Sequence, residues 1–338
     1  MIPKLSFVLT LAGLLGPIPP AFGQDPVEVL DPPVYTYSIV ARDPETGQMG
    51  VAVQSHYYSV GSVVPWAEAG VGAVATQAFA EKSYGPLGLA LMRGGKSAEE
   101  ALRALVALDE RAAIRQVAMI DAKGGVAAHT GERCVPAAAH RLGKNYSVQG
   151  NFLLNEQVVP AMAEAFEKAT GSLADRMVAA LEAAQAAGGD LRGQQSAAIL
   201  IVRGESTGKS WEDKLMDLRV EDHPQPVEEL KRLVRLHQAY GHYLNARISG
   251  HLEEALKNHQ AAERLAPEKV ELFFWHGVTL ANAGRVEEAL PFFKKAFEED
   301  IHWALLVPRL PRSGRLVDDP AVIEKILTVS PQKIETHR

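Results

Sequence analysis

Residues 36–55 read TYSIVARDPETGQMGVAVQS, and this stretch decides how the first domain begins. The segments 36–43 and 49–55 are rich in β-branched and small apolar residues, which favour strands. Between them, PETGQ carries the Pro and Gly that are typical of a turn. We therefore predict a β-hairpin whose first strand begins at Thr36.

The strands and helices that follow come in blocks. Strand pairs are expected within 59–77 and within 115–131, with turns at 68–70 and 123–125, and an apolar strand within 194–203 closes the domain. Helices are expected at 79–95, interrupted by Gly85-Pro86, and at 97–108, 155–170 and 172–189. Ser97 with Glu100 and Ser172 with Asp175 form capping boxes, and Asn155 is a further candidate cap.

This order predicts an α+β domain over 36–220. Runs of strands followed by pairs of helices favour antiparallel sheets covered by helices. The chain has neither a Gly-x-Gly-x-x-Gly fingerprint nor a P-loop, which excludes the usual nucleotide-binding doubly wound sheet.

A second, all-helical region is predicted over 227–300 from an internal repeat. Gly250 recurs as Gly284, Glu-Glu-Ala-Leu at 253–256 recurs at 287–290, and Ala262 recurs as Ala296, a spacing of 34 residues. This unit resembles the tetratricopeptide repeat, which implies a short solenoid and a protein-interaction surface. The alternative is that these helices only pack on the first domain. The tail, 301–338, is partly helical and loses the period.

The chain opens with a segment that has the features of an export signal. Residues 1–23 contain Lys4, an apolar run over 5–15 and a small-residue cleavage site, Ala21-Phe22-Gly23. An uncleaved anchor is the alternative. No later segment reaches membrane-spanning length, so we expect a periplasmic or secreted protein with 24–35 as a lead-in or propeptide.

Composition limits the classes of partner and cofactor. The 35 basic and 41 acidic side chains give a formal charge of −6 without a basic cluster, which argues against nucleic-acid binding. A lone cysteine, Cys134, allows no intrachain disulfide and is expected to be a small buried residue rather than a nucleophile. The scattered histidines lack metal-ligand spacing, so neither a metal nor a cofactor is expected.

Thr36 is the residue to which the sequence assigns chemistry. A threonine at a free N-terminus can act as a nucleophile because its own α-amine is a general base within reach of the hydroxyl. Strands also begin with threonine for purely structural reasons, so its position alone leaves both interpretations open.

Six separated motifs closely resemble the family known as domain of unknown function 1028, which is placed among the N-terminal nucleophile (Ntn) hydrolases. They are TYSIVARDPETGQMGVAVQS, VVPWAEAGVGAVATQ, YGPLGLALMRGG, HTGERC, YSVQGN and GGDLRGQQSAAILIV. The resemblance covers roughly residues 36–203 and implies a four-layer αββα sandwich with Thr36 as the nucleophile. It does not identify a substrate.

The resemblance also suggests which residues surround the nucleophile. His56 ends the second predicted strand, where Ntn sites gather groups that orient the nucleophile, and Thr76 or Gln77 is the expected source of an oxyanion-hole amide. Asn151 is a candidate hydrogen-bond partner for a substrate amide. Asp190 and Arg192 are expected to form an ion pair that shapes a loop or to bind a substrate carboxylate. For Thr76 and Gln77 the alternative is a buried strand whose polar ends only meet backbone partners.

Two functions remain open on the sequence alone. Signal cleavage would leave Gln24 to Tyr35, twelve residues, ahead of Thr36, so its amine is freed only if the Tyr35–Thr36 bond is also cut. If that bond is cut, we expect an exported amidohydrolase acting on a peptide or a small molecule. If it stays intact, we expect an inactive Ntn-fold binding module that recruits a protein through its repeats. A free-standing repeat adaptor is the weakest alternative, because two repeats are fewer than a solenoid needs.

Overall fold

The computed structural model describes residues 34–332, and the predicted signal and most of the lead-in lie outside them. Ten strands form two sheets in which every pair is antiparallel. The six-stranded sheet has the order β10-β9-β2-β1-β8-β7: Lys214–Val220, Ser196–Val202, Met49–Ser55, Thr36–Arg42, Tyr146–Gly150 and Ala139–Gly143. The four-stranded sheet has the order β3-β4-β5-β6: Pro65–Glu68, Gly72–Ala78, Arg115–Asp121 and Val126–Thr130.

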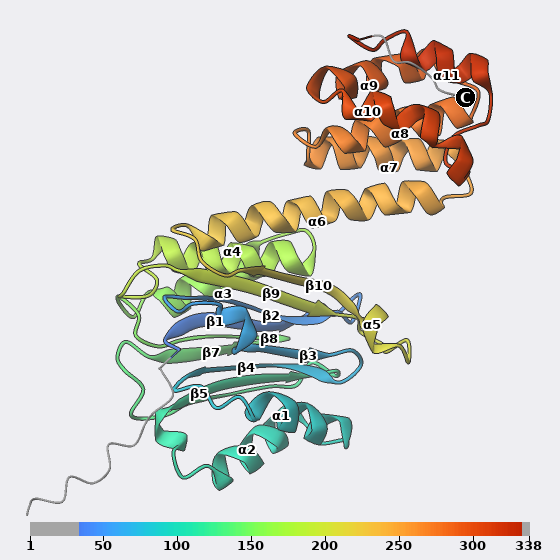
Figure 1. Cartoon of the computed structure of the whole chain (residues 1–338). Helices are drawn as coiled ribbons and strands as arrows, with labels where there is room; N and C mark the ends of the chain where they lie inside the picture. Colours follow the sequence, from blue (N-terminus) through green and yellow to red (C-terminus); the bar gives the residue numbers. More distant parts are fainter. Residues whose placement is uncertain (1–33, 333–338) are drawn as a thin grey trace, which may run out of the picture.

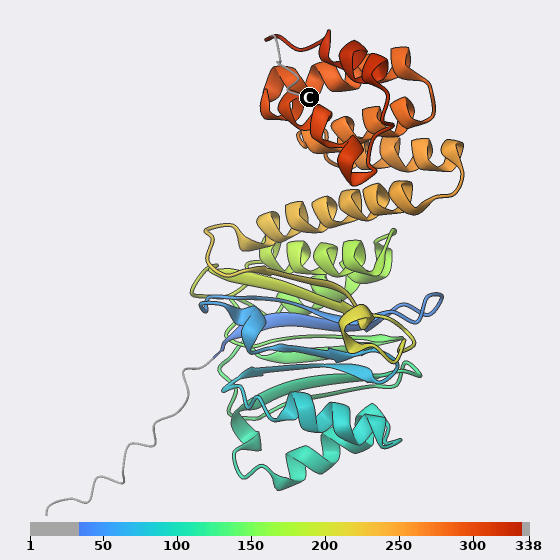
Figure 2. The same cartoon turned by 45° about the vertical axis from the view of Figure 1, so that its right-hand side comes forward.

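The two sheets stack between two helical layers (Figures 1 and 2). Helices α1 (Tyr84–Arg93) and α2 (Ala98–Leu108) cover the outer face of the four-stranded sheet. On the other side, α3 (Val158–Lys168) and α4 (Leu173–Ala186) cover the six-stranded sheet. The predicted mixed α/β architecture with antiparallel sheets is confirmed.

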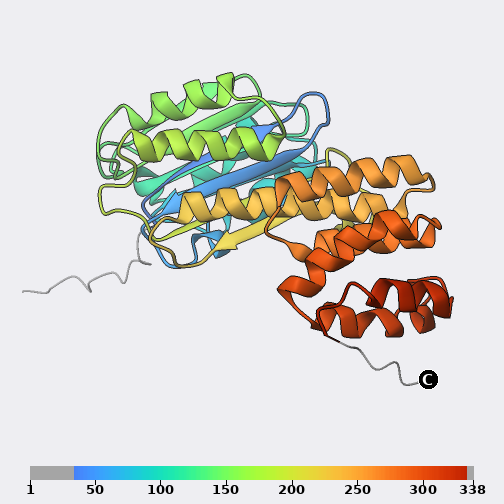
Figure 3. The ribbon, with the colours of Figure 1, turned by 90° about the horizontal axis from the view of Figure 1, so that it is seen from above.

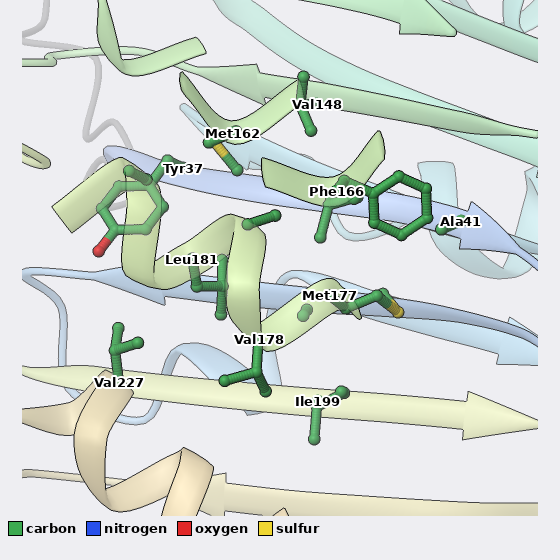
Figure 4. Close-up of a cluster of buried hydrophobic side chains, with 14 of the residues drawn as sticks. Tyr37, Ala41, Val148, Met162, Phe166, Met177, Val178, Leu181, Ile199 and Val227 are labelled. Atoms are coloured by element: carbon green, nitrogen blue, oxygen red, sulfur yellow. The ribbon is translucent and has the colours of Figure 1, made fainter. Parts of the chain in front are cut away.

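Each interface between layers has its own apolar core. Val40, Val51 and Val53 fill the space between the sheets, facing Ala73 and Ala75. The side chains that alternate with these along the same strands point to the opposite face of the sheet, where they pack against helices. Figure 4 shows Tyr37 from β1 and Ile199 from β9 on this side, packed with Met162, Phe166 and Leu181 of the helical layer. Alternation along β1 and β2 therefore decides which side chains point between the sheets.

Two of the predicted helix caps form, and two helix starts differ from the prediction. Both capping boxes form, at Ser97 with Glu100 and at Ser172 with Asp175. The helix expected to be interrupted at Gly85-Pro86 instead begins there, since α1 starts at Tyr84 and Pro86 occupies its first turn, where a missing amide proton is tolerated. The candidate cap Asn155 is not the N-cap of α3, which is Gln157; Asn155 instead lies two residues ahead of that cap and accepts the amide proton of Gln157 at 2.8 Å.

Three strands, β7, β8 and β10, were not predicted from the sequence. The motif YSVQG, for which no strand was predicted, is β8 and pairs directly with β1; β7 precedes it in a hairpin. The charged segment after β9 contains β10, an edge strand. Both β7 and β10 are edge strands with exposed polar residues, so they lack the apolar signal that marks buried strands.

The C-terminal region consists of helices (Figure 3). Its members are α6 (Pro226–Ile248), α7 (Leu252–Leu265), α8 (Val270–Asn282), α9 (Val286–Glu299), α10 (His302–Leu306) and α11 (Pro320–Leu327). Helix α6 connects the two regions: Val227, Leu230 and Val234 join the core over α4, while Ala239 and Tyr243 pack with α7 and α8. Within the described part of the chain, every helix is too short or too polar to cross a bilayer.

Candidate active site

Thr36 begins β1 in the interior of the six-stranded sheet and is fully buried. Its register partner on β2 is Ser55. The Thr36 hydroxyl has two acceptors in reach, the Val34 carbonyl oxygen at 2.8 Å and the Ser55 Oγ at 3.0 Å. A single hydroxyl proton can serve only one of them at a time, so it can move between a backbone and a side-chain acceptor.

The peptide bond that precedes Thr36 is held by two donors. The Tyr35 carbonyl oxygen accepts from Ser55 Oγ at 2.5 Å and from Arg192 Nη2 at 2.8 Å. Asp190 fixes this arginine: its carboxylate accepts from Arg192 Nε at 3.0 Å and from Nη2 at 2.7 Å, and the Asp190 side chain is fully buried. The Tyr35 carbonyl is thus polarised by a hydroxyl and a guanidinium together.

The residues ahead of Thr36 lie across the site in extended form. Val34 makes an antiparallel bridge with Ala78, donating to its carbonyl at 2.5 Å and accepting from its amide at 2.9 Å. The Tyr35 ring stacks on Phe152, with ring centres 4.5 Å apart, and meets Phe79 edge-on at 5.9 Å. Desolvation between these groups raises the pKa of the Tyr35 phenol, against an opposing effect from Arg192.

The carbonyl of Thr36 itself is bound by a buried amide network. It accepts from Gln77 Nε2 at 3.2 Å and from the Asn151 backbone amide at 3.0 Å. Gln116 links the two side chains, because its Oε1 accepts from Gln77 Nε2 at 2.7 Å and from Asn151 Nδ2 at 2.8 Å. These bonds fix the backbone of Thr36 rather than its hydroxyl.

The network continues between the sheets. Ser38, two residues after Thr36, donates to Gln77 Oε1 at 2.6 Å and accepts from Gln149 Nε2 at 2.7 Å. Ser147 is the last member of this hydrogen-bond network and donates to Gln149 Oε1 at 2.8 Å. All four side chains are fully buried, so each bond satisfies a polar group that would otherwise be costly there.

Five of the seven candidates from the sequence meet at this point. Thr36, Gln77 and Asn151 share the network, and Asp190 with Arg192 hold the preceding peptide. The expected ion pair forms, and it shapes the loop around Tyr35.

Two candidates lie elsewhere. The Thr76 amide, expected to serve an oxyanion, donates to the Val64 carbonyl at 3.2 Å, and its hydroxyl donates to the Glu81 carbonyl at 3.0 Å. Strand alternation turns Thr76 away from the site when Gln77 points into it. His56 is exposed and contributes only its backbone amide, which donates to Asp190 Oδ2 at 3.3 Å.

Two other residues with chemically reactive side chains, His129 and Cys134, are engaged in structural contacts. The His129 ring bonds the Ala112 carbonyl through Nε2 at 2.8 Å. Cys134 donates to the Arg115 carbonyl at 3.3 Å, and burial raises the pKa of its thiol, the opposite of what a nucleophile needs. Over residues 34–332, no cluster of three or more His, Cys, Asp or Glu side chains could hold a metal ion.

Sequence reasoning missed several residues that build the site. Ser55, Tyr35, Phe79 and Phe152 were not among the predicted site residues. Gln116 did leave a signal, since it is a polar residue directly ahead of the apolar run VAMI in a predicted strand. A buried amide in such a strand requires partners from a neighbouring strand or sheet.

Fold and site together define a class: an α+β protein with two stacked antiparallel sheets between helical layers, and a buried threonine at the head of an interior strand. Residues 36–230 match the model of DUF1028, a family of unknown function, and the chain belongs to this family. The crystal structure of protein SPO2555 from Silicibacter pomeroyi, also of DUF1028, is similar, with a TM-score of 0.54 and 31% identity over 60% of this chain and 88% of that chain. No curated protein matches the chain. The family match ends within α6, ahead of the repeat.

Proposed function

We propose that this protein is an exported amidohydrolase of the Ntn type, with Thr36 as the nucleophile once its amine is free. The observation that carries the proposal is the environment of the Tyr35–Thr36 peptide. Its carbonyl accepts from Ser55 and Arg192, while the hydroxyl of the next residue bonds the same Ser55. The four stacked layers are those expected of an Ntn sandwich and support the assignment.

Maturation would begin with attack of Thr36 Oγ1 on the Tyr35 carbonyl carbon. The Thr36 hydroxyl proton passes to Ser55 Oγ, and the Ser55 proton passes to the Tyr35 carbonyl oxygen, along bonds of 3.0 and 2.5 Å. Arg192 stabilises the negative charge that builds up on that oxygen until the proton arrives. The C–N bond then breaks as the proton moves from this oxygen to the nitrogen, the carbonyl re-forms, and an ester joins Tyr35 to Thr36 Oγ1. Water hydrolyses the ester and leaves a free threonine.

Turnover would repeat this chemistry on another amide. The freed α-amine, with an ordinary pKa near 8, takes the hydroxyl proton as Thr36 attacks the substrate carbonyl. Ser55 and Arg192 are the donors to the oxyanion, in place of the Thr76 amide, which is already bonded. Asn151, whose backbone amide donates to the Thr36 carbonyl, has a buried Oδ1 with no hydrogen-bond partner among the described residues, and this oxygen is an available acceptor for a substrate amide.

The second candidate is an inactive binding module. It is favoured by the segment Val34–Tyr35, which covers Thr36 completely when the bond is intact. In this case the function would lie in the C-terminal helices. The pairs α6/α7 and α8/α9 follow the 34-residue repeat, and Gly284 adopts φ of 76° in the second turn, as a tetratricopeptide-like unit would allow. Such a surface would recruit a protein partner in the envelope.

The deciding experiment is intact mass and N-terminal sequencing of the full chain produced by an export-competent host. We expect the native protein to begin at Thr36 and a Thr36→Ala variant to retain the preceding residues. Thr46→Ala is the matched control, because Thr46 is an exposed turn residue bonded only locally, to Asp43 and Gln48. If the native chain and Thr36→Ala both begin at Gln24, the hydrolase proposal fails and the binding module stands.

A further inference from the structure

The segment Val34–Tyr35 is bound as a peptide substrate would be. Val34 exchanges both backbone hydrogen bonds with Ala78, which is the way an extended peptide adds to a strand. The next carbonyl, that of Tyr35, is the one held by Ser55 and Arg192. Val34 therefore occupies the place where the backbone of a substrate would pair with the protein, and the Tyr35 carbonyl occupies the oxyanion site.

The Tyr35 ring is held on three sides. Phe152 lies parallel to it, with an interplanar angle of 18°, and Phe79 stands at 87° to it. The Arg192 guanidinium carbon lies 4.9 Å from the centre of the Tyr35 ring and 5.4 Å from that of Phe152. Stacked, edge-on and cation–π contacts all select a planar aromatic group over an aliphatic group of similar size.

The walls of this pocket are held in uncommon backbone conformations. Phe152 and Ala78 adopt φ of 57° and 69°, and they are two of four non-glycine residues with positive φ in the described chain. Two backbone hydrogen bonds hold Phe152. Its amide donates to the Val135 carbonyl at 2.9 Å, and its carbonyl accepts from the Leu191 amide at 3.0 Å. Strain of this kind persists where surrounding bonds over-determine it, as at ligand clamps.

The second wall is anchored as firmly. The Phe79 carbonyl accepts from Arg115 Nη1 at 2.6 Å, and Arg115 is itself buried and paired with Asp109 at 2.9 Å. Both aromatic walls are therefore fixed by the protein frame rather than by the Tyr35 ring, and they would remain in place after that ring departs.

We infer that the pocket formed by Phe79, Phe152 and Arg192 is the acyl-side subsite of the enzyme, and that its substrates are peptides or N-acylated amides with an aromatic residue directly before the cut bond. This inference rests on the proposed function, because it assigns the substrate of the same site. A residue with an extended backbone precedes the aromatic one and pairs with Ala78. A free substrate carboxylate is a poor fit for Arg192, whose charge is already balanced by Asp190.

The first arm of the test uses the released native enzyme. Hydrolysis of acetyl-Val-Tyr-aminocoumarin is compared with that of acetyl-Val-Leu- and acetyl-Val-Ala-aminocoumarin. We expect kcat/KM for the tyrosyl amide to exceed that for the alanyl amide by about 10-fold or more, the effect of burying one large side chain. In Phe152→Leu the ratio of tyrosyl to leucyl hydrolysis falls at least several-fold. Leu154→Ala is the control, because Leu154 lies in the same loop and is 54% exposed.

The second arm needs no catalysis. The full-length Tyr35→Ala chain, with the ring removed, is titrated with p-cresol, the tyrosine side chain alone, and with 4-methylcyclohexanol as a non-aromatic match, followed by ligand-observed NMR. We expect p-cresol to bind this variant in preference to the cyclohexanol. The Thr36→Ala chain, which keeps the Tyr35 ring in place, does not bind p-cresol, and adding Phe152→Leu to Tyr35→Ala weakens the binding.

The outcomes distinguish failure of the aromatic subsite from failure of the proposed hydrolase activity. A released enzyme that cleaves leucyl and alanyl amides as fast as the tyrosyl amide overturns the aromatic subsite and leaves the hydrolase intact. A chain that is never cut, yet binds p-cresol in the Tyr35→Ala form, overturns the hydrolase and supports an aromatic-binding pocket. Equal binding of p-cresol and 4-methylcyclohexanol overturns the pocket in either case.

Discussion

Arg192 contacts Tyr35 in two ways at once. Its Nη2 donates to the Tyr35 carbonyl at 2.8 Å, while its guanidinium carbon lies 4.9 Å from the centre of the Tyr35 ring. One side chain thus holds both the carbonyl that would be attacked and the ring attached to it. Asp190 makes this possible by fixing the plane of the guanidinium with two hydrogen bonds.

Arg192→Lys tests the carbonyl contact. Lysine keeps the charge but loses the fork that engages Asp190 and Tyr35 together. We expect release of Thr36 to slow by about 10- to 100-fold, as for loss of one oxyanion donor, measured by mass spectrometry over time. Arg219→Lys is the matched control, because Arg219 also follows its aspartate by two residues and bonds Asp217 through Nε, but on the surface. Equal release rates in the two variants would contradict the role of Arg192.

Ser55→Ala tests the proton path. The variant lacks the hydroxyl that lies between Thr36 Oγ1 and the Tyr35 carbonyl. We expect release to slow by about 10-fold or more, while stability falls by only about 1 kcal/mol for the lost hydrogen bonds. Release is followed by mass spectrometry and stability by urea unfolding. Ser62→Ala, at an exposed serine bonded only to the Ser59 carbonyl, should change neither. Unchanged release in Ser55→Ala would remove Ser55 from the mechanism.

Gln116→Leu tests the buried network. Gln116 Oε1 accepts from Gln77 and Asn151, and its Nε2 has the Ala139 and Gly150 carbonyls within 3.1 and 2.9 Å. Removing the amide leaves several buried polar groups unpaired, so we expect the free energy of unfolding to fall by about 3 kcal/mol or more. Gln157→Leu, at an exposed glutamine, should stay within about 0.5 kcal/mol in urea unfolding. A loss below about 1 kcal/mol would show that the network relaxes around the change.

His259 gives the helical region a pH dependence. It is buried, stacks on His276 at 4.9 Å, and its Nε2 bonds the Thr279 hydroxyl; desolvation, with a smaller effect from His276, lowers the pKa of His259 from 6.5 to about 4. Between about pH 6.5 and 4, His259 is therefore protonated in the unfolded chain but neutral in the folded chain. The free energy of unfolding falls as the pH drops through this range, by up to about 3 kcal/mol.

The measurement is urea unfolding across pH 4 to 8 for the native chain and His259→Phe. Phenylalanine keeps the volume and the stacking but cannot take up a proton, so we expect its stability to fall less on acidification. His302→Phe, at an exposed histidine, should follow the native curve. Identical pH curves for His259→Phe and the native chain would contradict the assignment.

Much of the fold could be predicted from local patterns in the sequence. Both capping boxes join residues three apart, and the first hairpin follows from alternation and a Gly-containing turn within 20 residues. The helical repeat was visible because it recurs in the chain itself. These features depend on neighbours along the chain, so they can be read without knowing the tertiary structure.

The site depended on contacts that no local pattern reports. Gln77 and Thr76 were equal candidates, and only the orientation of β4 decided that Gln77 points to Thr36. The histidine expected to orient the nucleophile ends β2 with its ring in solvent.

By itself, the sequence determined the first hairpin, the two capping boxes, the 34-residue repeat and the choice of Thr36 as the residue of interest. The tertiary structure decided what surrounds Thr36: Arg192, 157 positions from Tyr35 in the chain, and the aromatic walls from two separate loops. The physical reason is that strand and helix signals arise from short-range periodicity. A site between stacked sheets instead requires polar and aromatic groups from distant strands to satisfy one another in a space closed to water.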